Sequence, residues 1–148
     1  MKRLFVILAG LALAATAVFA EATSAEKTVF DSYLKIQASL AADSLKDVAT
    51  AAAVIAKAVQ TDADKKLPAA VAKQAEELGK AADISAARAA FKELSRSLIA
   101  YRKANKSVAQ QYHVAYCPMA DASWLQTNKT IANPYFGSSM LHCGEIKD

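Results

Sequence analysis

Apolar residues recur at spacings of three and four along most of the chain, which is the period of an amphipathic helix. The first such stretch runs from Thr28 to Gln60. Its apolar positions are Phe30, Tyr33, Leu34, Leu40, Leu45, Val48, Ala52, Ile55 and Val59. Charged residues occupy the other face, and the alanine runs favour helix. We therefore predict one long helix, which the polar segment 61–64 is expected to end.

A short helix and a second long helix are predicted next. Pro68 suits a first helical turn, and Gly79 can end the short helix that follows it. Asp83 or Ser85 can cap the next helix, which is expected from about Ile84 to Val108. Its apolar stripe consists of Ile84, Ala87, Phe91, Leu94, Leu98 and Tyr101. Short polar turns between these helices favour antiparallel neighbours.

The pattern changes near Tyr112, where the alanine density falls and aromatic residues, prolines and glycines collect. Pro118 and Pro134 interrupt helix, while Gly137 and Gly144 permit positive φ angles. The aromatic residues Trp124, Tyr135 and Phe136 are expected to form the hydrophobic core of this part of the chain. We predict an irregular tail that folds back on the helices.

The expected fold class is therefore all-α. An antiparallel bundle of three to four helices is expected over about residues 28–112, and an irregular Cys/Met-rich C-terminal tail over residues 113–148 is expected to pack on it. Residues 21–148 are long enough for one domain with a hydrophobic core of its own.

The first twenty residues have the pattern of a secretory signal peptide. Lys2 and Arg3 form a positive start, residues 4–15 are apolar, and small residues precede a cut that we place after Ala20. An uncleaved anchor is the alternative. No later segment is long and apolar enough to span a bilayer, so we expect no stable membrane insertion after cleavage. In a bacterium these features predict a periplasmic protein.

Charge gives no indication of a nucleic-acid partner. The chain has 18 basic and 14 acidic residues, and two of the basic residues belong to the expected signal peptide. The others are spread among acidic residues without a basic stripe or interleaved aromatics. We also find no Gly-rich phosphate loop, no carboxylate pair placed for acid–base chemistry and no Ser/His/Asp set, so we do not expect an enzyme.

The candidate chemistry is confined to a short window near the C-terminus. After residue 20 the chain has two cysteines, two methionines and two histidines, and the segment 21–112 contains none of them. They are His113, Cys117, Met119, Met140, His142 and Cys143. Thiolate and thioether sulfurs favour Cu(I), and imidazole suits copper and zinc. Each methionine lies two or three residues from a cysteine, which indicates a soft-metal site.

A structural disulfide is the alternative interpretation of the same residues, because exported cysteines usually pair. A Cys117–Cys143 bridge would close a loop of about 27 residues and stabilise the fold by roughly 3–4 kcal/mol. With the bridge closed, Met119, Met140 and His142 would remain as ligands, with His113 as a more remote candidate. A bridge that opens reversibly is a third interpretation.

The tail also carries a family resemblance. It reads C-P-M-A from 117, W-L-Q from 124 and I-A-N-P-Y-F-G-S-S-M-L-H-C-G-E-I from 131. These motifs resemble a bacterial periplasmic domain family of formerly unknown function, which is also found fused to the C-terminus of copper/silver efflux pump periplasmic adaptor subunits. The matching positions are Cys117, Pro118, Met119, Ala120, Trp124, Leu125, Asn133, Pro134, Tyr135, Phe136, Gly137, Met140, Cys143 and Gly144. The segment 121–123 is shorter than in many members.

The resemblance implies a helical bundle followed by this Cys/Met tail, with a role in heavy-metal handling. We expect a soluble periplasmic protein that binds Cu(I) or Ag(I) through Cys117, Met119, Met140 and Cys143. It would buffer the ion or deliver it to an efflux partner such as an adaptor subunit. His142 is a further candidate and His113 a more remote one; neither is among the family positions. The competing expectation is a disulfide-stapled protein–protein interaction module of the cell envelope without metal.

Overall fold

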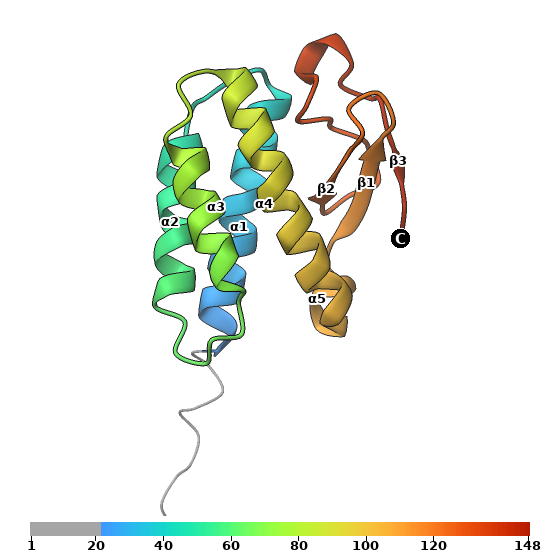
Figure 1. Ribbon diagram of the computed structural model, residues 1–148. Coiled ribbons are helices and arrows are strands. Elements are labelled where there is room, and N and C mark those ends of the chain that lie inside the picture. Colours follow the sequence, from blue (N-terminus) through green and yellow to red (C-terminus); the bar gives the residue numbers. More distant parts are fainter. Residues whose placement is uncertain (1–21) are drawn as a thin grey trace, which may run out of the picture.

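The computed structural model describes residues 22–148, so the expected signal peptide lies outside the described residues. The helices are α1 (Ala22–Ala41), α2 (Val48–Gln60), α3 (Ala69–Gly79), α4 (Ile84–Ala104) and α5 (Lys106–Ala109). The strands are β1 (His113–Cys117), β2 (Ala122–Gln126) and β3 (Glu145–Ile146), with a 3₁₀ turn η1 (Gly137–Ser139) before β3. Helix α4 lies between the other long helices and the strands (Figure 1).

The expectation of an all-α fold is wrong, because the tail forms a three-stranded antiparallel sheet with the order β2-β1-β3. His113 lies opposite Gln126 in the β1–β2 hairpin, and Ala115 lies opposite Ile146 in the β1–β3 pair. The fold is therefore mixed α and β. Strands this short carry too few residues for a clear two-residue alternation, and their hydrogen bonds join segments far apart in the sequence.

The predicted helix over residues 28–60 is two helices. Asp43 and Asp47 adopt left-handed backbone angles, with φ of 53° and 64°, and the chain reverses between them. Leu45, which we expected on the apolar stripe, lies in this reversal with 38% of its surface exposed. The apolar period crosses the break because both helices face the same core, and aspartate tolerates the left-handed region better than most residues.

Local signals predicted the other helix ends more closely. The Asp83 side chain accepts a hydrogen bond from the Ala86 backbone N–H at 2.8 Å, as expected of an N-cap. Gly79 is the last residue of α3. Helix α4 ends earlier than expected because Asn105 adopts an extended conformation, with φ of −122° and ψ of 103°.

The sheet and the bundle share one hydrophobic core, to which Trp124 and Leu125 contribute fully buried side chains. Strand β2 is at the edge of the sheet, and both α4 and α1 pack against it. The Tyr33 hydroxyl accepts a hydrogen bond from the Leu125 backbone N–H at 3.1 Å and lies 2.7 Å from the Ser95 hydroxyl. The buried Tyr33 hydroxyl therefore satisfies the Leu125 N–H, which has no strand partner at this edge of the sheet.

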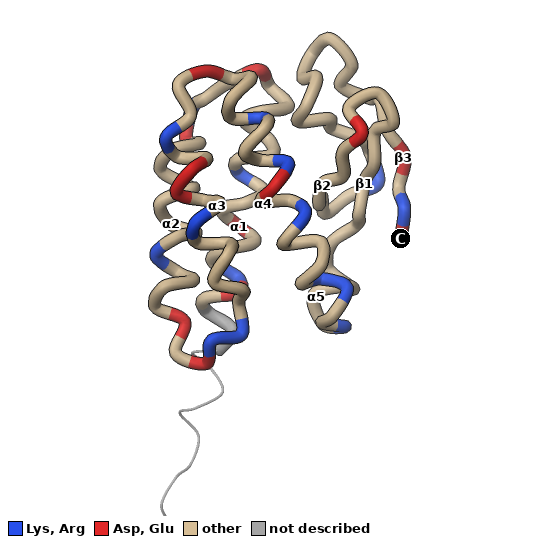
Figure 2. Tube along the Cα trace, viewed as in Figure 1, with Lys and Arg blue, Asp and Glu red and all other residues tan. Residues whose placement is uncertain are grey.

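Acidic and basic residues are interspersed over the helices (Figure 2). Within residues 22–148, none of the helices is long and apolar enough to cross a membrane.

Candidate functional site

The two cysteines meet at the end of the sheet. Cys117 is the buried last residue of β1, and Cys143 is the partly buried second residue before β3. Their Sγ atoms lie 2.9 Å apart, and both cysteines are free thiols. The β1–β3 register explains the contact, because the pairing of Tyr116 with Glu145 places Cys117 opposite Gly144 when it is continued by one residue.

Gly144 lets the two segments approach this closely. Its φ is 144°, which side chains rarely adopt. A Cβ atom at this position would lie 3.0 Å from the Trp124 ring and 3.0 Å from the Tyr116 carbonyl oxygen. The glycine predicted for a turn therefore has a second role, since it brings Cys143 against β1.

The thiols of Cys117 and Cys143 have pKa values shifted in opposite directions. Burial raises the pKa of the Cys117 thiol, but hydrogen bonds from the Cys143 thiol, the Ala120 and Met119 backbone N–H groups and the Asn133 side chain together lower it below its ordinary value. The hydrogen bond with Cys117 and burial raise the pKa of Cys143. Cys117 therefore loses its proton first and Cys143 holds the remaining one. The thiolate is the form that binds soft metals and attacks disulfides.

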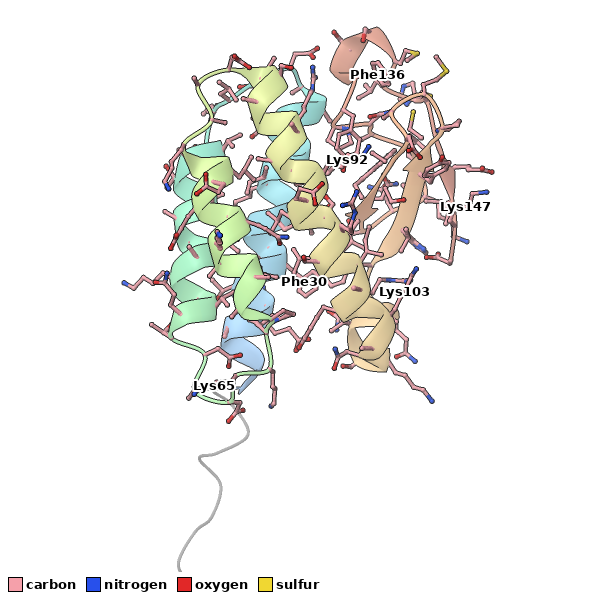
Figure 3. All side chains as sticks on the ribbon, viewed as in Figure 1. Phe30, Lys65, Lys92, Lys103, Phe136 and Lys147 are labelled. Carbon is pink, nitrogen blue, oxygen red and sulfur yellow. The ribbon has the colours of Figure 1, made fainter. Side chains whose placement is uncertain are left out.

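The two methionines lie on the turns that surround this pair. Met119 is in the β1–β2 hairpin turn, in which the Asp121 N–H donates to the Pro118 carbonyl at 3.2 Å, and 68% of Met119 is exposed. Met140 begins a turn in which the Cys143 N–H donates to its carbonyl at 3.0 Å. The sulfur atoms visible in Figure 3 gather at the upper right of the view. The structure thus brings both Cys-and-Met motifs to one end of the sheet.

Asn133 organises the turn that precedes Met140. It is fully buried, and its Nδ2 donates to the Cys143 carbonyl at 2.8 Å. Its Oδ1 accepts from the Tyr135 N–H at 2.8 Å and the Phe136 N–H at 3.3 Å, and its own N–H donates to the Leu141 carbonyl at 2.8 Å. This network fixes Cys143 relative to the N-P-Y-F-G segment.

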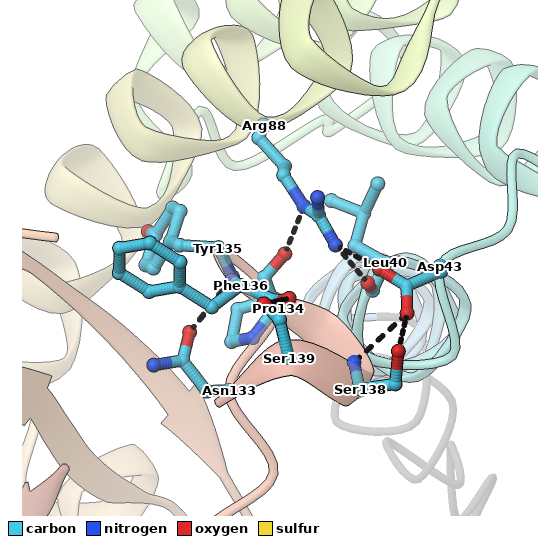
Figure 4. Close-up of polar contacts among 9 residues, drawn as sticks. All are labelled: Leu40, Asp43, Arg88, Asn133, Pro134, Tyr135, Phe136, Ser138 and Ser139. Carbon is cyan, nitrogen blue, oxygen red and sulfur yellow. Dashed lines mark hydrogen bonds and ion pairs between the residues drawn. The ribbon is translucent and has the colours of Figure 1, made fainter. Parts of the chain in front are cut away.

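A polar bridge from the helices holds the same segment, and the sequence analysis missed it (Figure 4). Arg88 Nε donates to the Pro134 carbonyl at 2.8 Å, and its Nη2 donates to the Leu40 carbonyl at 3.1 Å. Nη2 also donates to Asp43 Oδ1 at 2.7 Å, and Asp43 Oδ2 accepts from the Ser138 N–H at 2.8 Å. The hydrogen bonds from Ser138, followed by that from Arg88, lower the pKa of Asp43 to about 2.

The aromatic residues of the tail are structural, as predicted for its core. The Trp124 and Tyr135 rings meet edge to face with their centroids 5.9 Å apart. Trp124 Nε1 donates to Gln126 Oε1 at 2.9 Å, and the Tyr135 hydroxyl donates to the Ser123 carbonyl at 2.8 Å. Burial raises the pKa of Tyr135 well above its ordinary value.

The two histidines differ in their relation to the sulfur pair. His142 is exposed, and its Nδ1 lies 2.9 Å from the Ile131 carbonyl, so Nδ1 carries the hydrogen and Nε2 keeps a free lone pair. His113 begins β1, about 13 Å along the strand from Cys117 at about 3.3 Å per residue. Its Nδ1 contacts the Asp148 carboxylate. His142 is thus adjacent to Cys143 in the chain with its ring bonded to the Ile131 carbonyl, whereas His113 lies at the other end of β1 from Cys117.

These residues could bind a metal ion only with sulfur atoms as the main ligands. Within residues 22–148, no three His, Cys, Asp or Glu side chains converge on a common point where an ion could bind. Two sulfurs that bind one ion in tetrahedral geometry lie about 3.8 Å apart if each bond is about 2.3 Å, whereas disulfide sulfurs lie about 2.05 Å apart. The observed 2.9 Å lies between these separations. A soft ion would need the thioethers as further ligands.

Comparison with known proteins gives one match. Residues 29–110 match the family described as "Protein of unknown function (DUF3347)". The matched residues include α2, α3, α4 and most of α1. The tail motifs on which the resemblance was based lie outside the match. Neither the curated proteins nor the solved structures contain a match to the chain.

Proposed function

The chain belongs to the DUF3347 family, and from this premise we propose that it is a soluble periplasmic protein that binds Cu(I) or Ag(I). In this proposal it buffers the ion or delivers it to an efflux or resistance system. One observation carries the proposal: Cys117 and Cys143 lie with their sulfurs 2.9 Å apart, and each is close in the chain to a turn residue that has a thioether, Met119 and Met140 respectively.

The proposed ligands are the two thiols and the two thioethers. Cys117 supplies the thiolate, because its hydrogen-bond donors lower its pKa. Cys143 would also bind as a thiolate, so metal binding would release its proton, as expected for cysteine ligands. Met119 and Met140 complete a soft set that prefers Cu(I) and Ag(I) over zinc. His142 Nε2 is the candidate fifth ligand.

Delivery to a partner is supported by the exposure of Met119. A thioether carries no proton, so it can leave the ion and be replaced without a change of protonation. Because 68% of Met119 is exposed, it can meet a ligand of another protein while the cysteines still hold the ion. A periplasmic adaptor subunit of a copper/silver efflux pump is the proposed acceptor.

Native mass spectrometry of the metal-free protein titrated with Ag(I) tests the proposal. The reduced protein is expected to hold one ion tightly, and Met119→Leu/Met140→Leu is expected to lose it. Leucine and methionine have similar volumes, so the substitutions should change the free energy of unfolding by less than about 1.5 kcal/mol. His142→Gln shows whether the imidazole contributes.

Val54→Met serves as the matched control in the double variant. Val54 is an exposed apolar residue on α2, which Figure 1 places on the far side of the bundle from the sheet. This substitution restores a thioether away from the proposed site and should not restore binding. Undiminished Ag(I) affinity in the double methionine variant would refute the thioether site.

A disulfide-stapled interaction module is the second candidate, and the same 2.9 Å separation favours it. The two sulfurs need to approach by only about 0.9 Å to reach the disulfide length of about 2.05 Å. This candidate predicts that the purified protein is two hydrogens lighter than its dithiol mass and binds no ion in either redox state. It also predicts that Cys117→Ser lowers the midpoint of thermal unfolding and that added Ag(I) does not raise this midpoint.

Export to the periplasm has its own test. Expression of the full chain in a Gram-negative host, followed by cell fractionation, should give a periplasmic protein whose intact mass corresponds to residues 21–148. A cytoplasmic product that retains residues 1–20 would contradict the proposed location.

A further inference from the structure

A groove of about 370 Å³ lies between helix α4 and the β1–β2 hairpin, apart from the sulfur pair. Helix α4 contributes Lys92, Arg96 and Lys103, and the hairpin contributes Tyr116 and Asp121. The buried side chain of Ile99 lines the groove between the basic residues. Figure 3 labels Lys92 and Lys103 on the part of α4 that faces the sheet. The groove therefore has one basic wall and an apolar floor.

The basic residues follow the period of the helix, so they line the same face of α4. Lys92 and Lys103 are eleven residues apart, which is about 16 Å along the axis at about 1.5 Å per residue. Arg96 lies between them. A single phosphate or carboxylate cannot bridge this length, whereas an extended chain of about five residues can, at about 3.3 Å per residue. The spacing therefore fits an extended polyanion rather than a small ion.

Little within the described chain neutralises this wall. Lys92 Nζ donates to the Ala120 carbonyl at 3.3 Å, and Arg96 donates to Glu93 at 2.9 Å through one of its nitrogens. Lys103 forms no ion pair with any other residue of the range 22–148. Asp121 is the acidic residue of the lining, and it accepts a hydrogen bond from the Tyr116 hydroxyl at 3.2 Å.

We propose that this groove is a docking site for a short, extended, acidic segment of a partner protein. Carboxylates of the segment pair with the basic wall, and an apolar side chain covers Ile99. The net charge of the chain is only +4 and one aromatic residue, Tyr116, lines the groove, which favours an acidic peptide over a nucleic acid.

The groove and the sulfur pair share the hairpin. Lys92 contacts the Ala120 carbonyl, and the Ala120 N–H is one of the donors that lower the pKa of Cys117. A segment docked in the groove therefore lies beside the turn that carries the exposed Met119. The docking proposal rests on the groove alone. The further step, that the docked segment belongs to the protein that exchanges the ion, rests on the proposed function.

Fluorescence anisotropy with a labelled peptide of sequence Glu-Glu-Leu-Glu-Glu tests the docking site on the metal-free, reduced protein. The triple variant Lys92→Gln/Arg96→Gln/Lys103→Gln is expected to bind the peptide about tenfold more weakly or worse, because each charge pair contributes a modest amount. Wild-type affinity should fall with added salt, and the triple variant should lose most of this dependence. The amide signals of Ile99 and Tyr116 should shift in NMR spectra of the wild-type complex.

A matched control separates a specific site from total charge. Lys35, Lys57 and Lys73 are exposed on α1, α2 and α3, and replacing all three by glutamine removes the same charge away from the groove. The control variant should bind like wild type, and a Gln-Gln-Leu-Gln-Gln peptide should bind far more weakly than the acidic one. Equal losses in both variants, or tighter binding of a single-stranded oligonucleotide to the same residues, would overturn the proposal.

The peptide-binding experiment tests the groove separately from the metal site. If Met119→Leu/Met140→Leu abolishes Ag(I) binding and leaves peptide affinity unchanged, both proposals stand. If wild type binds no Ag(I) but the groove variant still loses the peptide, only the metal proposal fails.

Discussion

Removal of one hydroxyl group from the helical bundle should loosen the sheet that carries the sulfur pair. The Tyr33 hydroxyl lies between the Ser95 hydroxyl, at 2.7 Å, and the Leu125 N–H, at 3.1 Å, and all three residues are fully buried. Tyr33→Phe keeps the ring, which stacks on Phe91 with centroids 4.8 Å apart. The substitution therefore leaves the packing almost unchanged and deprives two buried polar groups of a partner.

The expected loss in the free energy of unfolding depends on how many buried polar groups lose a hydrogen-bond partner. A buried donor or acceptor that loses its hydrogen bond costs about 1–3 kcal/mol. Leu125 is fully buried and its N–H loses the Tyr33 hydroxyl as acceptor, while a serine hydroxyl in a helix can rotate toward a carbonyl of the preceding turn. We therefore expect Tyr33→Phe to lower the free energy of unfolding by about 2–4 kcal/mol.

Urea unfolding monitored by tryptophan fluorescence measures this cost. Trp124 is the only tryptophan, is fully buried, and precedes Leu125 in β2, so its emission reports on the affected strand. The midpoint should fall and the slope against urea should stay the same. Tyr116→Phe is the matched control, because the Tyr116 hydroxyl bonds only to the exposed Asp121; its midpoint should hardly move.

A double-variant cycle with Ser95→Ala isolates the buried pair. If Tyr33 and Ser95 interact as the structure shows, the cost of the double substitution should be smaller than the sum of the two single costs by about 1 kcal/mol. Strict additivity, or a cost below about 0.5 kcal/mol for Tyr33→Phe alone, would refute the reasoning that this hydroxyl holds the edge of β2.

The remaining predictions concern the polar bridge and the cysteines. Gly137→Ala should destabilise the fold, because Gly137 has a φ of 57° and a Cβ there would lie 2.0 Å from Asp43 Oδ1 and 2.6 Å from Arg88 Nη2. In an Asp43→Gly background the destabilisation in urea unfolding should shrink, but the contact with Arg88 and the left-handed cost of about 1–2 kcal/mol should remain. The pKa of Asp43 is lowered from 3.8 to about 2, so its contribution is complete above about pH 4 and is lost as the pH falls toward 2; Asp43→Asn should remove this part of the acid dependence of the thermal midpoint. In a thiolate absorbance titration of the reduced protein, the first ionisation should lie below the ordinary 9.0 and the second above it, and Cys143→Ala should raise the pKa of Cys117 because it removes a hydrogen-bond donor to the thiolate.

The helices could be predicted from the sequence because their signals are local. The Asp83 cap acts within one turn, and the stripe on α4 repeats over many turns. The break at Asp43 and Asp47 was missed because neither glycine nor proline marks it. The sheet was missed for a different reason: β3 has two residues and forms only by pairing with a strand about thirty positions earlier, so no local window contains the evidence.

The candidate site shows the same difference between local and long-range signals. Clustering of sulfur residues in the sequence was enough to place Cys117 near Met119 and Cys143 near Met140, because only a few residues separate the members of each pair; that these four residues bind an ion stays a prediction. No local sequence signal indicated Arg88, which lies on α4 and donates to the Pro134 carbonyl 46 positions away. Basic residues on helices usually face solvent, and only the folded chain distinguishes this one.

The helical segment that the family match covers contains none of the sulfur atoms, yet it supplies the anchors of the turns that carry them. Tyr33 holds β2, the Gln37 amide donates to the Ala132 carbonyl at 2.6 Å, and Arg88 holds the N-P-Y-F-G segment. Each of these side chains bonds to backbone groups of the tail, so it fixes the path of the chain and leaves the tail side chains free to vary. The bundle therefore fixes the backbone around Cys117 and Cys143, whose sulfurs lie 2.9 Å apart, through contacts that do not involve the sulfur side chains.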